Sequence, residues 1–233
     1  MIKFYLLAFN QLKDPRFIKP LIWSSILSIG SLGLLLVIGI GSVDWLFDLF
    51  SESIISWFGD WGDWIKVATQ FLVSFFLLAI AYFFFGSVHA AYLGLFLDDI
   101  IDAVRDKHYP GIELNPAPDL LTSTKASIRF VLTSLMFNIL ASPLFLLGWF
   151  FPPSGLILQI WINGLLLGRE YGYLIEQRIP NSTQAEKESY TPFGMLAETI
   201  WLIPVINLLS PILLSAAILH RNMNKPKEVT SLG

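Results

Sequence analysis

The stretch LIWSSILSIGSLGLLLVIGIGSV, residues 21–43, decides the fold because it contains no charged residue over 23 positions. A second stretch, VATQFLVSFFLLAIAYFFFGSVHAAYLGLFL, covers residues 67–97, and its only ionisable residues are His89 and two tyrosines. A helix needs about 20 predominantly apolar residues to cross the hydrocarbon core of a bilayer. A core helix of a soluble domain instead alternates apolar and polar positions. Both stretches therefore predict transmembrane helices.

The composition of the whole chain agrees with a membrane protein. Of the 233 residues, 55% are hydrophobic and 14% are charged, whereas a soluble domain carries about 25% charged residues. The length is that of one domain. No basic block interleaved with aromatic residues occurs, so nucleic-acid binding is not expected. Cysteine is absent, which excludes disulfides, thiolate metal sites and a cysteine nucleophile.

The placement of lysine and arginine predicts the orientation of the two helices. Four basic residues precede the first stretch, and between the two stretches only Lys66 stands against five acidic residues. Basic residues concentrate in cytoplasmic loops. The pattern predicts a cytoplasmic N-terminus, an external connection over residues 44–66 and a return to the cytoplasm after the second stretch. We expect the bacterial inner membrane as the location.

The connection over residues 44–66 has its own periodicity. Acidic or small polar residues recur at positions 44, 48, 52, 56 and 60, and tryptophan, phenylalanine and aliphatic residues fill the opposite side. This spacing indicates an amphipathic helix, and tryptophan favours the headgroup level of a bilayer. We expect the helix to lie on the external surface of the membrane.

Residues 126–178 predict a re-entrant helical hairpin, which enters the membrane and leaves it on the same side. An apolar run of 22 residues, Phe130–Phe151, ends at two prolines, and the next run, Ser154–Gly168, has 15 residues. Fifteen residues cover about 22 Å of the roughly 30 Å core. Basic residues flank both ends, which places both ends in the cytoplasm. A full hairpin with a short second limb is the alternative.

Residues 192–223 predict a second re-entrant hairpin. Prolines at positions 204 and 211 interrupt the apolar run Phe193–Leu219, and basic residues follow it. We expect the turn near Asn207–Ser210. The alternative is one proline-kinked helix that crosses once and puts the C-terminus outside. Interrupted helices are tolerated in lipid only where protein or a water-filled cavity covers the break, so we expect a homo-oligomer with both termini in the cytoplasm.

The predicted fold is therefore a single all-α membrane domain. It has transmembrane helices over residues 21–43 and 67–107, the second extending into the cytoplasm, together with the external helix and the two re-entrant hairpins.

Polar groups within or beside the apolar runs are the first candidates for a site. Helix N-termini near Ser154 and Ser210 would carry partial positive charge and unpaired N–H groups that suit an anion, unless the prolines only make turns. Asn163 and Asn207 interrupt apolar segments, where polar groups either face a water path or connect helices. Two charged residues follow the first hairpin's second limb directly, Arg169 and Glu170.

Charged residues next to the long helices are the second set of candidates. Arg16 precedes the first stretch and offers a planar guanidinium to an oxyanion; setting the topology is its competing role. Asp98, Asp99 and Asp102 form a D-D-x-x-D run, which holds Mg²⁺ and a diphosphate in membrane prenyltransferases, but the second acidic motif of those enzymes is missing. The spacing of Asp102 and Arg105 favours an ion pair on one helix instead.

Metal and cofactor motifs are not evident. His89, His108 and His220 are scattered and have no metal-ligand spacing. No glycine-rich phosphate loop precedes a helix. We expect no metal, no cofactor and no enzymatic activity.

Several separated segments carry a family resemblance. They are Asp14-Pro15-Arg16-Phe17 with Pro20, Leu97-Asp98-Asp99-x-x-Asp102-x-Val104 with His108-Tyr109-Pro110, Gly168-Arg169-Glu170-Tyr171 with Arg178, and Phe193-Gly194 leading to Ile203-Pro204-Val205-Ile206-Asn207, Pro211 and Ala216-Ala217. In this order and spacing they resemble the CysZ family of bacterial sulfate transporters, which is related to the etoposide-induced endoplasmic reticulum membrane proteins.

The resemblance implies an oligomeric inner-membrane protein that takes up sulfate for cysteine biosynthesis, with two spanning helices and two hairpins that enter part of the membrane. In the family a G-L-R motif before the first span takes part in sulfate binding, and the matching place here reads Asp14-Pro15-Arg16. Arg16, with Phe17 beside it, carries over. Asp14 adds a negative charge that repels sulfate by about 1 kcal/mol at close range.

We therefore expect an anion transporter or channel in the lipid bilayer, with sulfate or a related oxyanion as its substrate. The predicted binding residues are Arg16, Phe17, Ser154, Asn163, Asn207 and Ser210. The predicted path and its ion pairs involve Arg169, Glu170, Asp99, Asp102 and Arg105. The alternative is a membrane scaffold or envelope protein that shares the fold without transporting, followed by the Mg²⁺-dependent prenyltransferase.

Overall fold

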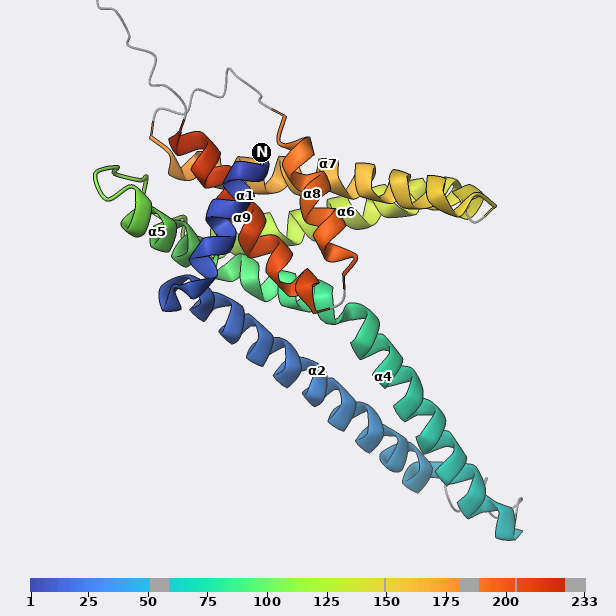
Figure 1. Ribbon diagram of the computed structural model, residues 1–233. Coiled ribbons are helices and arrows are strands. Elements are labelled where there is room, and N and C mark those ends of the chain that lie inside the picture. The colour runs from blue at the N-terminus through green and yellow to red at the C-terminus, as the bar shows by residue number, and fades with distance from the viewer. Residues whose placement is uncertain (51–58, 149, 181–188, 204, 225–233) are drawn as a thin grey trace, which may run out of the picture. The chain divides into compact units, whose positions relative to one another are not determined.

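The computed structural model describes residues 1–50, 59–148, 150–180, 189–203 and 205–224, and these residues form helices and connections without a strand. The all-α prediction is confirmed (Figure 1). The elements in chain order are α1 (Ile2–Asn10), η1 (Gln11–Lys13), α2 (Pro15–Phe50), η3 (Gly59–Trp61), α4 (Gly62–Leu95), α5 (Leu97–His108), α6 (Leu120–Gly148), α7 (Pro152–Arg178), α8 (Thr191–Trp201), η4 (Ile206–Leu209) and α9 (Ser210–Met223).

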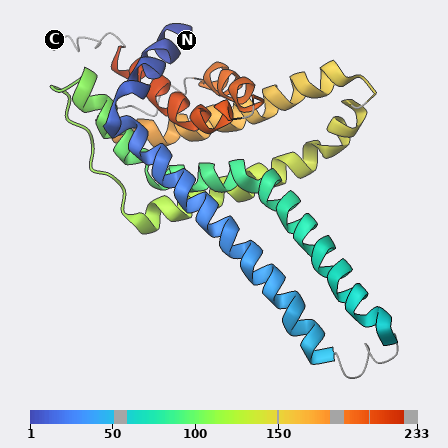
Figure 2. The ribbon, with the colours of Figure 1, turned by 60° about the horizontal axis from the view of Figure 1, so that its bottom comes forward.

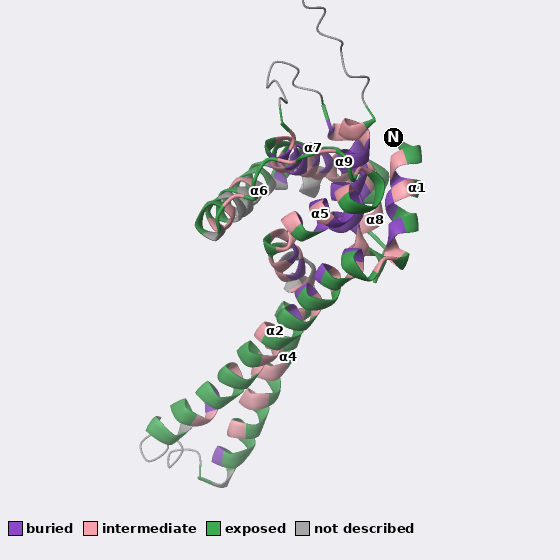
Figure 3. Cartoon of the chain, turned by 90° about the vertical axis from the view of Figure 1, so that its left-hand side faces the viewer, coloured by how far each residue is buried: buried purple, intermediate pink, exposed green. Residues whose placement is uncertain are grey.

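The chain divides into two compact units, Trp23–Tyr92 and the remainder. The first unit, which we call the long-helix unit, contains most of α2 and α4. Two segments in these helices, Pro15–Leu46 and Gly62–Tyr82, are long and apolar enough to cross a membrane, and almost none of their most apolar residues are buried. Figure 3 shows both helices largely exposed. An apolar surface of this extent requires an apolar surrounding.

Three contacts connect α2 and α4 within the long-helix unit. Ser24 Oγ lies 3.0 Å from His89 Nε2, so the buried His89 side chain contacts α2. Gly39 admits the side chain of Leu77, because a Cβ atom at position 39 would overlap it. At the far end the Asp44 carboxylate accepts a hydrogen bond from Gln70 at 2.7 Å and pairs with Lys66 at 3.3 Å. The two helices are therefore antiparallel neighbours.

The predicted external helix over residues 44–66 is divided between other elements. Residues 44–50 continue α2 and residues 62–66 begin α4, while 51–58 lie outside the described residues. Lys66 holds the end of α2 by pairing with Asp44 and Asp48. Trp45 is 64% exposed and Trp64 is 72% exposed, as aromatic side chains at a headgroup level would be.

The second unit, which we call the packed unit, is built around α9. Residues 210–220 are all buried (Figure 3). Helices α1, α5, α7 and α8 each contribute buried side chains to the same core, including Tyr5, Ala8, Ile100, Ile101, Val104, Ile175, Phe193 and Ala197. Helix α9 is thus the core helix of a protein interior.

Glycines set the distance between α7 and α8. A Cβ atom at Gly194 would overlap the Gly164 carbonyl oxygen, and one at Gly168 would overlap the carbonyl oxygen of Tyr190. A Cβ atom at Gly164 would lie 2.6 Å from Met195 Cα. Small residues at four-residue spacing allow two helix backbones to approach closely. This contact fixes α8 on α7.

The two regions predicted as re-entrant hairpins each contain a pair of helices, α6 with α7 and α8 with α9. Helices α6 and α7 form a V whose arms meet at the end of α6 and the start of α7 (Figure 2), and α6 continues through Pro143. Helix α7 has 27 residues and is about 40 Å long. Its polar second half continues the helix beyond the apolar limb and packs Tyr171 and Ile175 into the core. The helix is therefore longer than the apolar limb Ser154–Gly168. Entry of either hairpin into the membrane stays a prediction.

Helices α8 and α9 fold back on each other, and Ser210 Oγ donates to the Ala197 carbonyl oxygen at 2.6 Å. The region is therefore two helices in contact, and the side of the membrane on which the C-terminus lies stays a prediction. Between the two helices lies η4 (Ile206–Leu209), which overlaps the predicted turn region Asn207–Ser210. Because α9 is buried in the packed unit, its apolar composition reflects protein packing.

Candidate functional site

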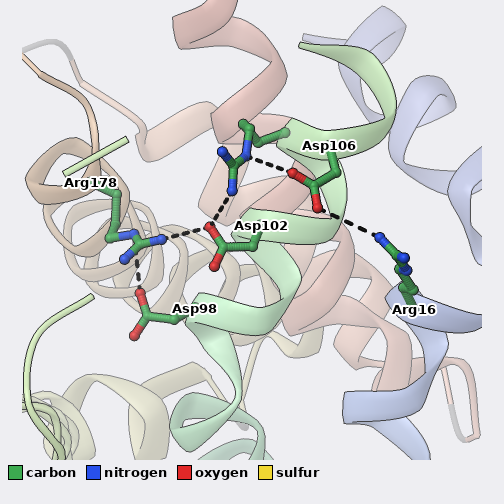
Figure 4. A network of polar contacts seen from close by, with 6 residues as sticks. Arg16, Asp98, Asp102, Asp106 and Arg178 are labelled. Carbon is green, nitrogen blue, oxygen red and sulfur yellow. Dashed lines mark hydrogen bonds and ion pairs between the residues drawn. The ribbon is translucent and has the colours of Figure 1, made fainter. Parts of the chain in front are cut away.

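A cluster of alternating charges brings together three segments of the packed unit (Figure 4). Helix α5 presents aspartates at four-residue spacing, which places them on one helix face. Arginines from the start of α2, from α5 itself and from the end of α7 face them. We call these residues the ion-pair cluster: Arg16, Asp98, Asp102, Arg105, Asp106 and Arg178.

Arg178 is the buried centre of the cluster. Its side chain is 5% exposed, its Nε atom lies 3.3 Å from Asp98 Oδ1, and its Nη2 atom lies 2.7 Å from Asp102 Oδ1. Burial raises the pKa of Asp98, and the Arg178 charge opposes that shift. The Arg178 carbonyl also accepts the Asn115 N–H at 2.8 Å. A guanidinium so enclosed ties α7 to α5 and has little access to a solute.

Arg16 is the exposed end of the cluster. Its Nη1 atom lies 3.6 Å from Asp106 Oδ2, and its side chain is 77% exposed. Asp106 is held more closely by Arg105, whose Nε atom lies 2.9 Å away. An ion pair between exposed groups contributes little energy. The Arg16 guanidinium therefore keeps N–H donors for an anion from solution.

Asp14 has two partners beside Arg16. Its Oδ1 atom accepts the backbone N–H of Arg16 at 3.0 Å and so caps the start of α2. Its Oδ2 atom lies 3.3 Å from Lys107 Nζ. Lys107 offsets the negative charge that was expected to repel sulfate at this place. The substitution of the family's glycine-type position by Asp14 is thus compatible with an anion at Arg16.

Four predicted binding residues have other partners in the structure. Phe17 is fully buried and belongs to the core of the packed unit, so its side chain does not face a solute. Ser154 Oγ donates to the Phe151 carbonyl at 2.7 Å, and Ser210 Oγ donates to Ala197. The hydroxyl proton of each serine is therefore already used in a hydrogen bond to a backbone carbonyl. Asn207 lies in η4, where its N–H donates to the Ile203 carbonyl at 2.9 Å.

Asn163 connects helices. Its side-chain amide donates to Glu198 Oε1 at 3.1 Å, between α7 and α8. Glu198 is buried, and Gln159 also hydrogen-bonds its carboxylate. This agrees with the interhelical role considered for Asn163, and it identifies Glu198 as a polar residue that sequence reasoning did not select. The charged pair that was predicted to line a path, Arg169 and Glu170, lies further along α7.

The aspartate run on α5 is divided by the fold. Asp98 and Asp102 face Arg178, whereas Asp99 is exposed. Within the described residues, no group of three histidine, cysteine, aspartate or glutamate side chains is placed to hold a metal ion. Of the predicted residues, the cluster thus unites Arg16, Asp102 and Arg105. Sequence reasoning missed Asp106 and did not assign Arg178 to the site; the four-residue spacing of the aspartates was the available signal.

Two histidines that are distant in the sequence meet at the end of α5. The rings of His108 and His220 lie 5.0 Å apart, edge to face. Tyr109 Oη lies 2.9 Å from His220 Nδ1, and Asn224 donates to Tyr109 Oη at 2.8 Å. Burial, together with the neighbouring His108, lowers the pKa of His220 to about 4. This contact fastens the end of α9 to α5.

A comparison with models of protein families found a match to most of the chain. A family model described as Sulfate transporter CysZ/Etoposide-induced protein 2.4 matches residues 4–211. The matched region includes all six residues of the ion-pair cluster and both helices that are apolar enough to span a membrane. Searches among curated proteins and among solved structures found no match. Because the family match covers most of the sequence, the predicted resemblance is confirmed, and the chain belongs to the Sulfate transporter CysZ/Etoposide-induced protein 2.4 family of membrane proteins.

Proposed function

We propose that this protein moves sulfate or a related oxyanion across the bacterial inner membrane, with both termini in the cytoplasm. The observation that carries the proposal is the exposed guanidinium of Arg16 at the start of a helix apolar enough to span the membrane. Family membership supports a transporter. Sulfate as the substrate, supply of cysteine biosynthesis and the orientation are parts of the proposal.

The chemistry of Arg16 suits capture of an anion that is later released. A guanidinium offers a planar fork of donors that matches two oxygens of an oxyanion. Asp106 lies 3.6 Å from this fork, a distance typical of a weak surface pair. An arriving oxyanion replaces Asp106, which then stays with Arg105. Arg178 cannot act in this way because two carboxylates already enclose it.

The proposal includes a homo-oligomer. The hairpin formed by α6 and α7 exposes large apolar side chains, among them Ile139, Leu140 and Ile157. A break between two helices is tolerated in lipid only where protein or a water-filled cavity covers it. A neighbouring copy would supply that cover. Arg169 and Glu170 remain proposed lining residues of the path.

Uptake of radiolabelled sulfate by proteoliposomes tests the proposal. A lost charge-assisted hydrogen bond of about 1.5 kcal/mol corresponds to roughly tenfold in affinity, so Arg16→Ala should weaken sulfate uptake by about tenfold at low sulfate. Lys13→Ala removes an equal charge from an exposed residue of the same segment and should leave uptake within about twofold. Arg16→Lys should fall between them, because it keeps the charge and loses the fork.

Two results would count against the proposal. Equal uptake by the native protein and Arg16→Ala would remove Arg16 from the site. No sulfate or sulfite uptake by the native protein, in vesicles where a known channel is active, would favour the non-transporting membrane protein instead.

A further inference from the structure

Helix α1 has two apolar faces with different surroundings. One face packs into the packed unit: Tyr5 and Ala8 are buried, and Tyr5 Oη donates to the Phe193 carbonyl oxygen at 2.8 Å. The Phe4 ring lies 6.3 Å from that of Phe193. These contacts hold α1 in a fixed rotation about its axis. Figure 3 shows the buried and exposed parts of this helix.

The opposite face of α1 presents three large apolar side chains outward. Ile2 is 66% exposed, Leu6 is 60% exposed and Phe9 is 57% exposed. Spacing of four and three residues places them on one side of a helix. In water such a row is an unpaired hydrophobic patch. We call these three residues the outward face.

The surroundings of the outward face are basic. Lys3 and Lys13 are exposed, and residues 1–13 contain no acidic residue. The first acidic residue, Asp14, is paired with Lys107. Helix α2 begins at Pro15, and its own outward apolar residues begin with Ile22, which is 52% exposed. The outward face therefore lies a few residues before the point where the chain enters an apolar environment.

We propose that the outward face of α1 docks on the anionic headgroup region of the membrane that α2 enters. An apolar row flanked by lysines matches the boundary between acyl chains and anionic headgroups. A second copy of the chain fits less well, because a two-fold contact brings the same patch together from both copies, and the charges of this patch are all positive. The proposal rests on the membrane-spanning helices and is independent of sulfate transport.

Fluorescence of a labelled full-length protein tests the docking. The native chain has no cysteine, so Leu6→Cys takes an environment-sensitive dye at one position. The protein is placed in nanodiscs of phosphatidylcholine with phosphatidylglycerol, and a spin label near the lipid headgroups serves as quencher. We expect a blue-shifted emission that loses most of its intensity to the quencher. Glu113→Cys, in an exposed connection between α5 and α6, should show neither effect.

Charge and self-contact are tested with the same label. Replacing phosphatidylglycerol with phosphatidylcholine should shift the Leu6→Cys emission toward red, and adding Lys3→Glu with Lys13→Glu should remove this dependence on lipid charge. Unquenched emission at Leu6→Cys, together with cross-linking of two copies through that cysteine, would overturn the proposal in favour of a second copy. Unquenched emission without cross-linking would show the face in water and would overturn it as well.

Discussion

Helix α9 and the middle of α2 are both apolar, yet the structure surrounds them differently. In α2 the side chains of Ile29, Leu34 and Val37 are 63%, 59% and 69% exposed. In α9 Ile212, Leu214 and Ile218 are not exposed at all. Hydrophobicity drives both segments out of water. It does not specify whether the apolar surrounding is lipid or protein.

Hydroxyl side chains in both regions donate to backbone carbonyls. In the long-helix unit, Ser28 Oγ donates to the carbonyl of Ser24 at 2.6 Å, and Thr69 Oγ1 to that of Ile65 at 2.8 Å. These bonds stay within one helix, as required where lipid offers no partner. In the packed unit Ser210 donates across to Ala197 of another helix. Polar contacts between helices also occur in the long-helix unit, at Ser24 with His89 and at Asp44 with Gln70, so the two regions differ in exposure and not in this respect.

The largest expected difference between the regions is in the cost of a cavity. Leu214→Ala in α9 should lower the free energy of unfolding by about 2–5 kcal/mol, because the site is enclosed and cannot collapse freely. Leu34→Ala in α2 should cost less than about 1 kcal/mol in detergent, because the micelle fills the space. Unfolding monitored by circular dichroism measures both. Equal losses would contradict the assignment of α9 to a protein core.

Removal of Arg178 tests the packed unit at its polar edge. Arg178→Ala leaves Asp98 and Asp102 without their guanidinium. We expect a loss of about 3 kcal/mol, at the low end for a broken buried pair because both carboxylates retain some exposure. Lys66→Ala, in the exposed pair at the end of the long-helix unit, should cost less than about 1 kcal/mol. A smaller loss for Arg178→Ala than for Lys66→Ala would reverse this ranking.

Glycines sharpen the comparison further. Gly194→Ala places a methyl group against the Gly164 backbone and should destabilise the packed unit by about 1–3 kcal/mol through overpacking. Gly30→Ala in α2 meets open space and should be neutral or stabilise by up to about 1 kcal/mol, as expected for alanine in a helix. The thermal midpoints of the two variants give the answer. A stabilising Gly194→Ala would show that α7 and α8 are further apart.

Acid should weaken the packed unit through His220. The pKa of this residue falls from 6.5 to about 4 on folding, so the unfolded chain takes up a proton first as the pH decreases. The stabilisation is complete above about pH 6.5 and is lost as the pH falls toward 4. Between pH 7 and 5.5 the loss is about 1 kcal/mol. Denaturant unfolding should show this slope in the native protein and a shallower one in His220→Gln; equal slopes would exclude His220 as its source.

Part of this architecture follows from the sequence because it is local. Uncharged runs predicted the two long helices, and prolines predicted the starts of α7 and α9. The four-residue spacing of the aspartates on α5 predicts that they share one face of the helix. The assignment of α9 to the core does not follow, because lipid and protein interiors select the same apolar residues.

The candidate site was predictable only in part. The resemblance and the position before an apolar helix pointed to Arg16. The pairing of Arg178 with Asp98 and Asp102 joins residues 80 and 76 positions apart, and the contact of His108 with His220 joins α5 to α9. Such contacts depend on the packing of α7 and α9, which hydropathy does not encode. Phe17 was misassigned because its position beside Arg16 does not show which way its side chain points.

The most direct measurement is photolabelling by a diazirine lipid in vesicles that contain the unmodified protein, followed by peptide mapping with mass spectrometry. The label reacts with side chains that touch acyl chains. The account predicts adducts on residues 23–46 and 62–82 and none on residues 210–220. Adducts on 210–220 as frequent as those on α2 would contradict it, because α9 would then face lipid.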